Sequence, residues 1–486
     1  MANGDSAAGT PPASREPASA RAVALLLILT GAAFGLRVIQ LRQSLVGDEV
    51  FTFTDVHDRS FGSVVSTVHT GGENSPPLYF LLAWLSAQLG DPAVWIRLPS
   101  LVFSTATVPL VYLLGRESVG RRAALIGAGV LALSPTAVFY GTEARPYATM
   151  VFFVVISTLA LLRAVETRSS RWWLVYALAS AAAAYSHYTS IFVLVVQAVW
   201  SVWMCRERIS QLLGANALVA LLYAPWLPHV RGKELAVIGA LHPLGVHTVL
   251  ADISRALVAH PSAPLGAVPG APALIAIGIC LLVGLAGGTR RWRASSIRLC
   301  PRSVLIAALA VATPVGLLLY SLLSTDLFLP RGLLASLPAA ALLLAAILSL
   351  NSARVTALLG GVVLAVLLFG TVRSLDAAYR RAPFREMAAY LDKNLGSRDA
   401  IIYVSFAAPG SIAVYLHPHL ALPPSPSVLG RIPRGGSAYV VLDREVAPHI
   451  DLSYMQRAGF QVTGRKHFAG QFPTDILTYR PRRGAR

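Results

Sequence analysis

Two adjacent carboxylates, Asp48 and Glu49, follow the first membrane-length apolar run of the chain. An ionisable group at the end of a membrane-spanning helix is costly to place there and is a candidate for function. Other polar side chains stand at the ends of later apolar runs: Glu73, Tyr140, Glu143, Arg145, Tyr147, His187, Tyr188, Asp326 and Arg331. Carboxylates combined with Arg, His and Tyr could take a proton from one reactant and hold an anionic leaving group on another.

Each of these residues also has a simpler explanation. Asp48 could only solvate a helix end, and Glu143 and Arg145 could form a local ion pair. His187 could be an interfacial residue with no further role. The tyrosines could belong to the aromatic belt at the membrane interface, and Arg331 could extend from a helix end into water. The functional hypothesis therefore depends on whether these residues lie on one side of the membrane.

The elements that must position them are apolar. The 486 residues are 55% hydrophobic and 13% charged, against roughly 25% charged residues in soluble proteins. Apolar runs of roughly 16–22 residues recur, and they lack the alternation of barrel strands. We predict an all-α polytopic membrane protein with about eleven transmembrane helices, at residues 22–40, 93–114, 122–139, 145–163, 172–186, 189–204, 211–228, 270–288, 303–324, 332–350 and 355–373.

The charges of the loops orient these helices. Residues 76–89 are apolar but short for a span, and we predict an interfacial helix there, inside a first outer loop at residues 41–92. A re-entrant helix would give the same parity. The Arg-rich loops then fall in the cytoplasm, as the positive-inside rule requires: residues 115–122, 163–171, 205–210, 288–303 and 351–354. The N-terminus is predicted to be cytoplasmic, and the C-terminus and the polar helix ends extracytoplasmic.

The two ends of the chain differ from its middle. Residues 1–21, rich in Ala, Ser, Pro and Gly, predict a disordered cytoplasmic tail. The transmembrane module is expected to cover residues 22–373. From residue 374 to residue 486 the charge rises and the apolar runs shorten, which predicts a small extracytoplasmic α/β domain that acts as a lid or docking domain. We expect its helices at 384–393 and 452–459, and its strands at 401–406, 438–442 and 461–479.

Composition also bounds the partners. The net charge of +18 comes mainly from Arg in short loops, so we expect a lipid bilayer and no nucleic acid as partner. The Arg, Ala, Gly and Pro bias is typical of a bacterial genome, which indicates the bacterial cytoplasmic membrane. No cofactor is required. A divalent metal on Asp48, Glu49 and His187 stays open, although no ligand spacing demands one, and the three cysteines predict no disulfide framework.

Several segments resemble a known family. They read VGDEVFTF at 46–53, NSPPLYFLL at 74–82, SPTAVFYGTEARPYA at 134–148, YSHYTSIF at 185–192 and FLPRGLLASLPAAALLL at 328–344. In this order they resemble the protein O-mannosyltransferase-like part of the glycosyltransferase C superfamily. That group includes the bacterial lipid A aminoarabinose and galacturonic acid transferases. The resemblance implies a polyprenyl-phosphate-sugar donor and an extracytoplasmic active site.

The resemblance also suggests roles for residues. Asp48 matches the acidic residue taken as catalytic base, and Glu49 is its neighbour. Arg331 matches a basic residue that faces the lipid phosphate in relatives, although Gly332 replaces their usual Tyr. Glu73 lies near a second loop carboxylate of some members, in a sequence that departs from theirs. The remaining candidate substrate contacts are Tyr79, Glu143, Arg145, Tyr147 and the pair His187 and Tyr188, which stands where some relatives have Lys.

The implied reaction is inverting transfer of a sugar from the lipid phosphate to a hydroxyl of a glycan, glycolipid or protein acceptor. One base opposite the leaving group gives inversion, whereas retention needs a second carboxylate as nucleophile. The lack of a nucleotide-binding fingerprint agrees with a lipid-linked donor. Two alternatives remain open: a transporter or flippase of lipid-linked sugars, which needs polar groups near the midplane, and a non-catalytic membrane scaffold.

Overall fold

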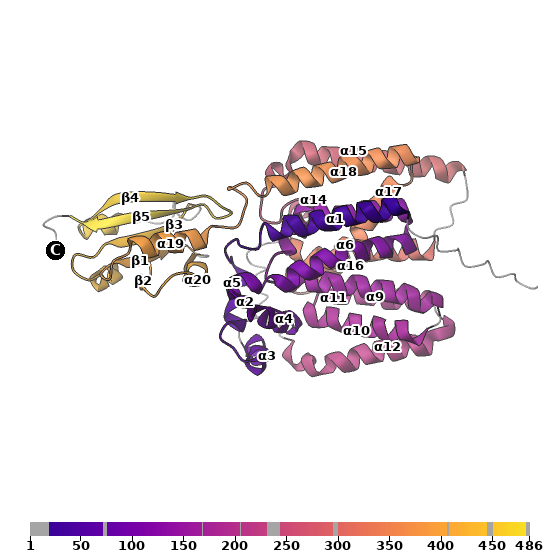
Figure 1. The fold of residues 1–486 in the computed structure, drawn as a ribbon, viewed down its shortest axis with the longest axis horizontal. Coiled ribbons are helices and arrows are strands. Elements are labelled where there is room, and N and C mark those ends of the chain that lie inside the picture. Colours follow the sequence, from indigo (N-terminus) through magenta and orange to yellow (C-terminus); the bar gives the residue numbers. More distant parts are fainter. Residues whose placement is uncertain are drawn as a thin grey trace, which may run out of the picture.

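The computed structural model describes residues 19–70, 75–167, 169–204, 206–230, 244–294, 300–405, 408–444 and 451–482. The predicted N-terminal tail lies outside the described residues, apart from its last three positions, where helix α1 begins. The described chain forms a bundle of helices with a small α/β unit at one end (Figure 1). It is mostly helical with one small sheet, as the sequence predicts.

Among the described residues, eight helices, some of them composite, are long and apolar enough to cross a membrane. They are α1 (Ala20–Val38), α5 (Pro92–Trp95) with α6 (Leu98–Ser118), α9 (Tyr147–Thr167), η1 (Arg206–Arg208) with α12 (Ile209–Tyr223) and η2 (Ala224–His229), η3 (Gly266–Gly270) with α15 (Ala271–Ala294), α16 (Pro301–Leu323), η4 (Pro330–Ser336) with α17 (Leu337–Leu348), and α18 (Ala353–Arg373).

The other three predicted spans are shorter helices, so the predicted number of eleven spans is not confirmed. They are α7 (Arg121–Leu133) followed by α8 (Pro135–Tyr140), α10 (Ser170–Ser186) and α11 (Ser190–Met204). A span needs roughly 20 helical residues, and α7 has 13. It ends because Pro135 starts a new helix, with the Ser134 side chain accepting from the Ala137 amide. Proline offers no N–H to continue the preceding helix.

Three helices between α1 and α5 cover one end of the bundle: α2 (Asp48–Val56), α3 (Phe61–Thr70) and α4 (Leu78–Ala87). The 10 residues of α4 are too few to span a bilayer. Gly47 precedes α2 with a φ of +56°, a conformation that suits glycine and lets the chain turn directly into the helix. Val56, Val64 and Phe80 join these helices in one buried cluster. This packing fixes the position of Asp48 at the start of α2.

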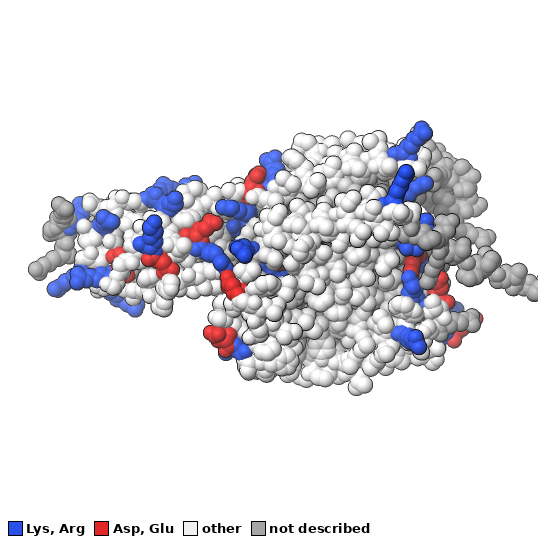
Figure 2. Space-filling model, in the orientation of Figure 1, with Lys and Arg blue, Asp and Glu red and all other residues white. Residues whose placement is uncertain are grey.

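Charged residues gather at the two ends of the bundle, and a wide uncharged band separates them (Figure 2). Leu27, Leu282 and Leu358 are each more than 60% exposed, as expected for side chains that face lipid. At the far end the Arg-rich loops contact one another, because Arg163 and Arg302 both bond to Glu117. The loop ends that carry Asp48, Glu143 and Arg331 meet at the opposite end, beside the α/β unit.

The α/β unit is a five-stranded sheet with the order β2-β1-β3-β5-β4. β1 pairs in parallel with β2 and β3, and β5 pairs antiparallel with β3 and β4. The predicted helices and strands are all found here. α20, β2 and η5 were not predicted, because they are too short for a periodic signal. The bounds are α19 (Phe384–Asn394), β1 (Ala400–Val404), α20 (Ala408–Ala413), β2 (Leu420–Leu422), η5 (Pro426–Arg431), β3 (Ala438–Asp443), α21 (Ser453–Arg457), β4 (Phe460–Phe468) and β5 (Thr474–Pro481).

The α/β unit is fastened to the turn that precedes α2. The Tyr415 hydroxyl accepts from the Leu45 amide at 2.9 Å, and the Arg385 amide donates to the Ser44 hydroxyl at 3.0 Å. The Arg385 guanidinium also lies 3.0 Å from an Asp91 carboxylate oxygen. The α/β unit therefore stands directly over the end of the bundle that carries Asp48.

The remaining described helix, α14 (Val246–Val258), packs beside η4 and α8.

Candidate active site

Asp48 and Arg331 form an ion pair across 283 positions of sequence. The Arg331 Nη1 lies 2.5 Å from Asp48 Oδ2, and both side chains are about one-third exposed. Burial alone would raise the pKa of Asp48, but the charges of Arg145 and Arg331 outweigh it, so that the pKa lies below its usual value. Asp48 is therefore ionised at neutral pH. The structure brings together the two residues that the sequence suggested as base and phosphate ligand.

Glu49 points the other way and is fully buried. The Arg97 guanidinium grips both of its oxygens, from Nε at 2.7 Å and from Nη2 at 2.6 Å. The Ala144 amide donates to it at 2.8 Å, and the Arg381 Nε lies 3.4 Å away. These partners hold the pKa of Glu49 below its usual value in spite of burial. Every Glu49 oxygen is occupied by protein, so the predicted catalytic role for Glu49 does not fit this structure.

Arg97 is a residue that the analysis of the sequence missed. It precedes α6, is fully buried, and also donates to the carbonyls of Leu41, Gln43 and Ser44. It thereby ties the turn before α2 to α6. Its signal was present, because an Arg inside a predicted apolar span is expensive and marks a special site. Arg381, between α18 and α19, was also missed, since no pattern surrounds it.

A cavity of about 450 Å³ opens between the bundle end and the α/β unit. Its charged lining consists of Asp48, Glu143, Arg331 and Arg381. The remaining lining residues are Val46, Gly47, Val50, Phe51, Phe139, Tyr140, Ser262, Gly410, Ser411, Gln471 and Phe472. The volume is within the range of roughly 300–1,000 Å³ usual for small-molecule sites. It places two carboxylates and two guanidiniums around one space.

Glu143 is the second carboxylate that lines this cavity, beside the Asp48 that pairs with Arg331. Its Oε2 is buried and has no hydrogen-bond partner in the described parts of the chain. Burial and the nearby charge of Glu49 raise the pKa of Glu143 to about 7. Near neutral pH it can therefore donate a hydrogen bond as an acid or accept one as a carboxylate. Asp48 and Glu143 thus have pKa values pushed apart, as in sites that divide acid and base roles.

This difference predicts a pH effect on stability. The folded protein binds the Glu143 proton more tightly than the unfolded chain does, so this residue lowers stability as the pH rises from its usual pKa of 4.5 to about 7. Glu143→Gln should therefore melt at a higher temperature, relative to wild type, at pH 8 than at pH 5. The measurement is a thermal melt of the detergent-solubilised protein at both values. An unchanged difference between the two proteins would contradict the burial of this carboxyl.

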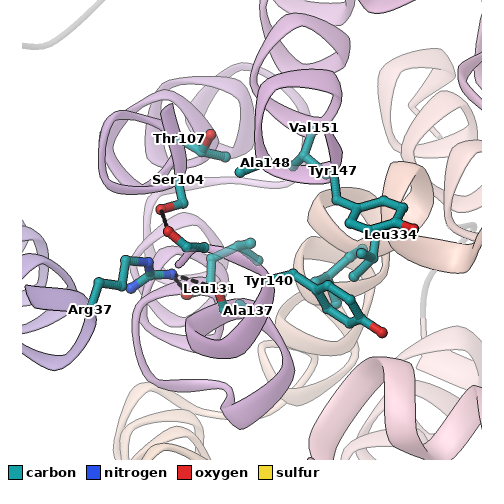
Figure 3. A pocket seen from close by; sticks show the side chains of 12 residues that line it. Arg37, Ser104, Thr107, Leu131, Ala137, Tyr140, Tyr147, Ala148, Val151 and Leu334 are labelled. Atoms are coloured by element: carbon teal, nitrogen blue, oxygen red, sulfur yellow. Dashed lines mark hydrogen bonds between the residues drawn. The ribbon is translucent and has the colours of Figure 1, made fainter. Parts of the chain in front are cut away.

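Arg37 supports the walls of the site from within the bundle. Its guanidinium donates to the carbonyl of Leu131 at 3.1 Å and to that of Ala137 at 3.1 Å (Figure 3). The Leu131 carbonyl would normally accept from the amide four residues later, which is Pro135 and has no N–H. Arg37 supplies the missing donor. It therefore stabilises the break between α7 and α8 that aims the following loop toward Asp48.

Tyr140, Tyr147 and His187 form an aromatic row beside the ion pair. Tyr147 lies with its ring centroid 5.2 Å from both other rings. In Figure 3 the rings of Tyr140 and Tyr147 lie next to each other beside Leu334. The His187 Nδ1 is 2.9 Å from the Thr189 hydroxyl, and burial with the charges of Arg145 and Arg331 lowers the pKa of His187 to about 3. His187 is therefore neutral at physiological pH.

Of the other predicted site residues, Arg145 lies near Asp48, whereas Tyr79 and Tyr188 bond to other parts of the protein. The charge of Arg145 lowers the pKa of Asp48, and the Arg145 guanidinium lies over the ring of Phe80, 6.0 Å from the centroid. Tyr79 is fully buried, and its hydroxyl donates to the Ile96 carbonyl at 2.9 Å, so the predicted substrate contact does not fit. The Tyr188 hydroxyl accepts from Trp226 in the same apolar cluster as α3 and α4. Glu73 lies outside the described residues.

Asp48, Glu49 and His187 are the residues that the sequence left open as ligands of a divalent metal ion. Within the described ranges, no three His, Cys, Asp or Glu side chains are arranged to hold an ion. Of the three residues that the sequence left open as ligands, Glu49 is occupied by guanidinium groups and the His187 Nδ1 by Thr189. Asp48 and Glu143 are the carboxylates that line the cavity together.

Comparisons with known proteins agree with the resemblance seen in the sequence. The profile described as "Dolichyl-phosphate-mannose-protein mannosyltransferase" matches residues 74–229. ArnT from Cupriavidus metallidurans in its apo state aligns with a TM-score of 0.54 at 12% identity, over 94% of this chain and 98% of that chain. The chain therefore has the fold of ArnT. A search among curated proteins found no match.

Two further solved structures share this fold. ArnT from C. metallidurans bound to undecaprenyl phosphate aligns with a TM-score of 0.50 at 14% identity, over 95% of this chain and 98% of that chain. The archaeal oligosaccharyltransferase AglB from Archaeoglobus fulgidus, in complex with an inhibitory peptide and a dolichol-phosphate, aligns with a TM-score of 0.53 at 12% identity, over 94% and 74% of the two chains. The resemblance predicted from the sequence is thus confirmed.

Proposed function

We propose that this chain is a membrane glycosyltransferase that moves a sugar from a polyprenyl phosphate to an acceptor hydroxyl. The observation that carries the proposal is the pairing of Asp48 with Arg331 at the rim of one cavity. A carboxylate beside a guanidinium supplies a proton acceptor next to a phosphate ligand. The lipid phosphates bound by ArnT and AglB support a donor of this class.

The site is proposed to face the extracytoplasmic side of a bacterial cytoplasmic membrane. The Arg-rich loops meet at the opposite end of the bundle, and such loops stay in the cytoplasm. In this orientation α4 lies in the interface, where its exposed side chain Leu85 contacts headgroups and lipid. Residues 22–373 form the transmembrane module, and residues 374–486 form an extracytoplasmic domain above it.

In the reaction, the acceptor oxygen attacks the anomeric carbon and forms the new glycosidic bond. The bond from that carbon to the phosphate oxygen breaks, and its electron pair leaves with the polyprenyl phosphate. Asp48 accepts the proton of the acceptor hydroxyl. Arg331, with Arg145 behind it, stabilises the charge that develops on the phosphate. Glu143 holds a substrate hydroxyl through a hydrogen bond, and its raised pKa allows it to donate near neutral pH.

The ion pair also suggests when the base becomes active. In the absence of donor, Arg331 keeps the pKa of Asp48 low and makes it a weak base. The donor phosphate is a second anion that competes for the same guanidinium. Its arrival draws Arg331 from Asp48 and raises the basicity of the carboxylate. The proton acceptor is then strongest when the donor is in place.

Inversion is supported by the position of Glu49. A retaining enzyme needs a second carboxylate that attacks the anomeric carbon from close by. Glu49 follows Asp48 in sequence but is turned into the protein and held by Arg97. Its role in this proposal is to position the turn before α2 and thereby the orientation of Asp48.

Arg331→Ala should weaken use of the lipid donor. Hydrogen bonds to charged groups contribute about 1.5–3 kcal/mol, so the KM for donor should rise by roughly 10–100-fold. Undecaprenyl phosphate should protect the wild type against thermal unfolding, undecaprenol should protect it less, and Arg331→Ala should lose most of that difference. Arg434→Ala, which removes an exposed guanidinium outside the cavity, is the control. A change of acceptor preference alone in the Arg331 variant would contradict the phosphate assignment.

The rival functions make different demands. A flippase of lipid-linked sugars needs polar groups near the membrane midplane, whereas the charged cavity here lies at the helix ends, beside the α/β unit. A scaffold needs no ion pair facing a cavity. Glycosyl transfer is therefore the function that the geometry supports best.

A further inference from the structure

We propose that the α/β unit supplies the acceptor-binding half of the site, and that this half recognises a neutral, hydroxyl-rich carbohydrate through Ser411 and Gln471. The inference rests on the proposed function and deepens it. Four residues of the unit line the same cavity as Asp48: Gly410, Ser411, Gln471 and Phe472. The site is thus incomplete without the part of the chain that the sequence suggested as a lid or docking domain.

Ser411 carries a hydroxyl group that makes no hydrogen bond within the described part of the chain. The residue is 1% exposed, and its Oγ is buried without a partner in the described ranges. Buried hydroxyl groups nearly always have a hydrogen-bond partner, because burying a hydroxyl without a hydrogen bond costs free energy. Ser411 lies on α20 and lines the cavity. An acceptor hydroxyl there would satisfy the Oγ.

Gln471 offers a second polar group from a different element, the turn between β4 and β5. Its backbone amide donates to the Arg380 carbonyl at 2.8 Å, while its side-chain amide makes no hydrogen bond to the described residues. That side chain has two donors and one carbonyl acceptor. A sugar hydroxyl both donates and accepts, so Ser and Gln are suited to it. The Phe472 ring beside them offers an apolar face for the C–H groups of a sugar ring.

The charge of the lining separates two sides of the cavity. The ionisable lining residues Asp48, Glu143, Arg331 and Arg381 all come from the bundle end and the segment that leaves α18. From α19 onward, the α/β unit contributes none, although the whole chain carries a net charge of +18. A charged acceptor group on this side would be left without a counter-charge. The lining therefore favours a neutral acceptor.

The position of these residues relative to Asp48 is set by close packing. A Cβ on Gly410 would lie 3.5 Å from Val50 Cγ1, so α20 lies directly against α2. A Cβ on Gly470 would lie 2.9 Å from the Ala382 Cα, so the turn that carries Gln471 fits closely against the segment after Arg381. Ser411 and Gln471 are thus held at fixed positions relative to the charged residues of the cavity. A loosely tethered lid would not give such contacts.

The arrangement argues against a peptide acceptor. Peptides are commonly bound by addition of a strand to a free sheet edge. The edge strands of this sheet are β2 and β4, and none of their residues lines the cavity. Strand addition therefore does not bring a peptide into this cavity, whereas the polar side chains of its wall suit hydroxyl groups.

The test uses the purified full-length chain with undecaprenyl-phosphate-linked sugars as donors. Octyl glycosides serve as neutral acceptors and a Ser/Thr peptide library as the alternative. Ser411→Ala and Gln471→Ala should each raise the KM for the glycoside by roughly 3–10-fold, as expected for loss of one hydrogen bond. The double variant should raise it by roughly 10–100-fold. The kcat and the protection by undecaprenyl phosphate should stay at wild-type values.

Matched controls are Ser427→Ala and Gln456→Ala, which remove the same side chains at exposed positions of the same unit. An unchanged KM in the double variant, use of peptides alone, or no binding of octyl glycosides to the wild type would each overturn the carbohydrate subsite. A saturation-transfer NMR experiment reads glycoside binding even when turnover is absent. Failure of the proposed function looks different, because the wild type would then release no polyprenyl phosphate with any acceptor.

Discussion

Asp48→Asn should lower the rate of sugar transfer by about 10²–10⁴-fold, the usual contribution of a general base. Asn keeps the shape of the side chain and can still accept from Arg331, but it cannot take up the acceptor proton. The measurement is the initial rate with saturating donor. The melting temperature should change little, because Asp48 is one-third exposed and is not part of the buried network around Glu49.

The control for this variant is Asp58→Asn, an exposed carboxylate of the same loop. It should have wild-type activity. Retention of most activity by Asp48→Asn would show that another group takes the proton. Glu143 would then be the next residue to examine, since it lines the same cavity and has a pKa of about 7.

Glu49→Ala should destabilise the fold by about 3–5 kcal/mol, the usual cost of removing one partner from a buried ion pair. The variant leaves the Arg97 guanidinium buried without its carboxylate and takes an ion-pair partner from Arg381. Thermal melting in detergent should show a large drop, and activity should fall in parallel with the folded fraction.

A conservative variant separates stability from chemistry. Glu49→Gln keeps the shape of the side chain and an oxygen that can accept from Arg97 and from the Ala144 amide, whereas Glu49→Ala removes both. Glu49→Gln should melt at a higher temperature than Glu49→Ala. If Glu49→Ala instead keeps the wild-type melting temperature and loses activity, Glu49 contacts the substrate directly, as its place beside Asp48 first suggested.

The positions of the helices were predicted well from the sequence, but the number of helices long enough to span the membrane was not. Each predicted apolar run is a helix, because the runs are long and continuous. The break at Pro135 and the short helices α10 and α11 leave eight helices of spanning length in the described ranges. Hydropathy averages over such a break. Chain geometry at Pro135 and the rescue of the Leu131 carbonyl by Arg37 decide the local structure.

The candidate site was predicted in part for a physical reason. Asp48 and Arg331 stand at helix ends, where an ionisable residue is conspicuous against apolar neighbours. Arg97 was concealed because it lies inside an apolar run, although its cost there was a usable signal. Asp48 and Glu49 are adjacent, and their side chains point in different directions. Arg97 and the Ala144 amide hold Glu49 inside the protein, so Asp48 is the one that faces the cavity. Spacing in the sequence does not contain that information.

The acceptor-side wall was beyond reach of the sequence. Ser411 and Asp48 are far apart in the chain, and no periodic pattern links them. Their meeting depends on how the α/β unit sits on the bundle, through contacts such as that of Tyr415 with Leu45. Short elements such as α20 have no sequence signal of their own, yet they complete the cavity.

The central claim is tested most directly by following the lipid product. Purified protein is mixed with a radiolabelled polyprenyl-phosphate sugar and an extract of envelope acceptors, and release of polyprenyl phosphate is measured with wild type and Asp48→Asn. The account predicts acceptor-dependent release by the wild type, with the label moved to the acceptor, and almost none by the variant. Movement of intact lipid-linked sugar across vesicles without release of polyprenyl phosphate would contradict it.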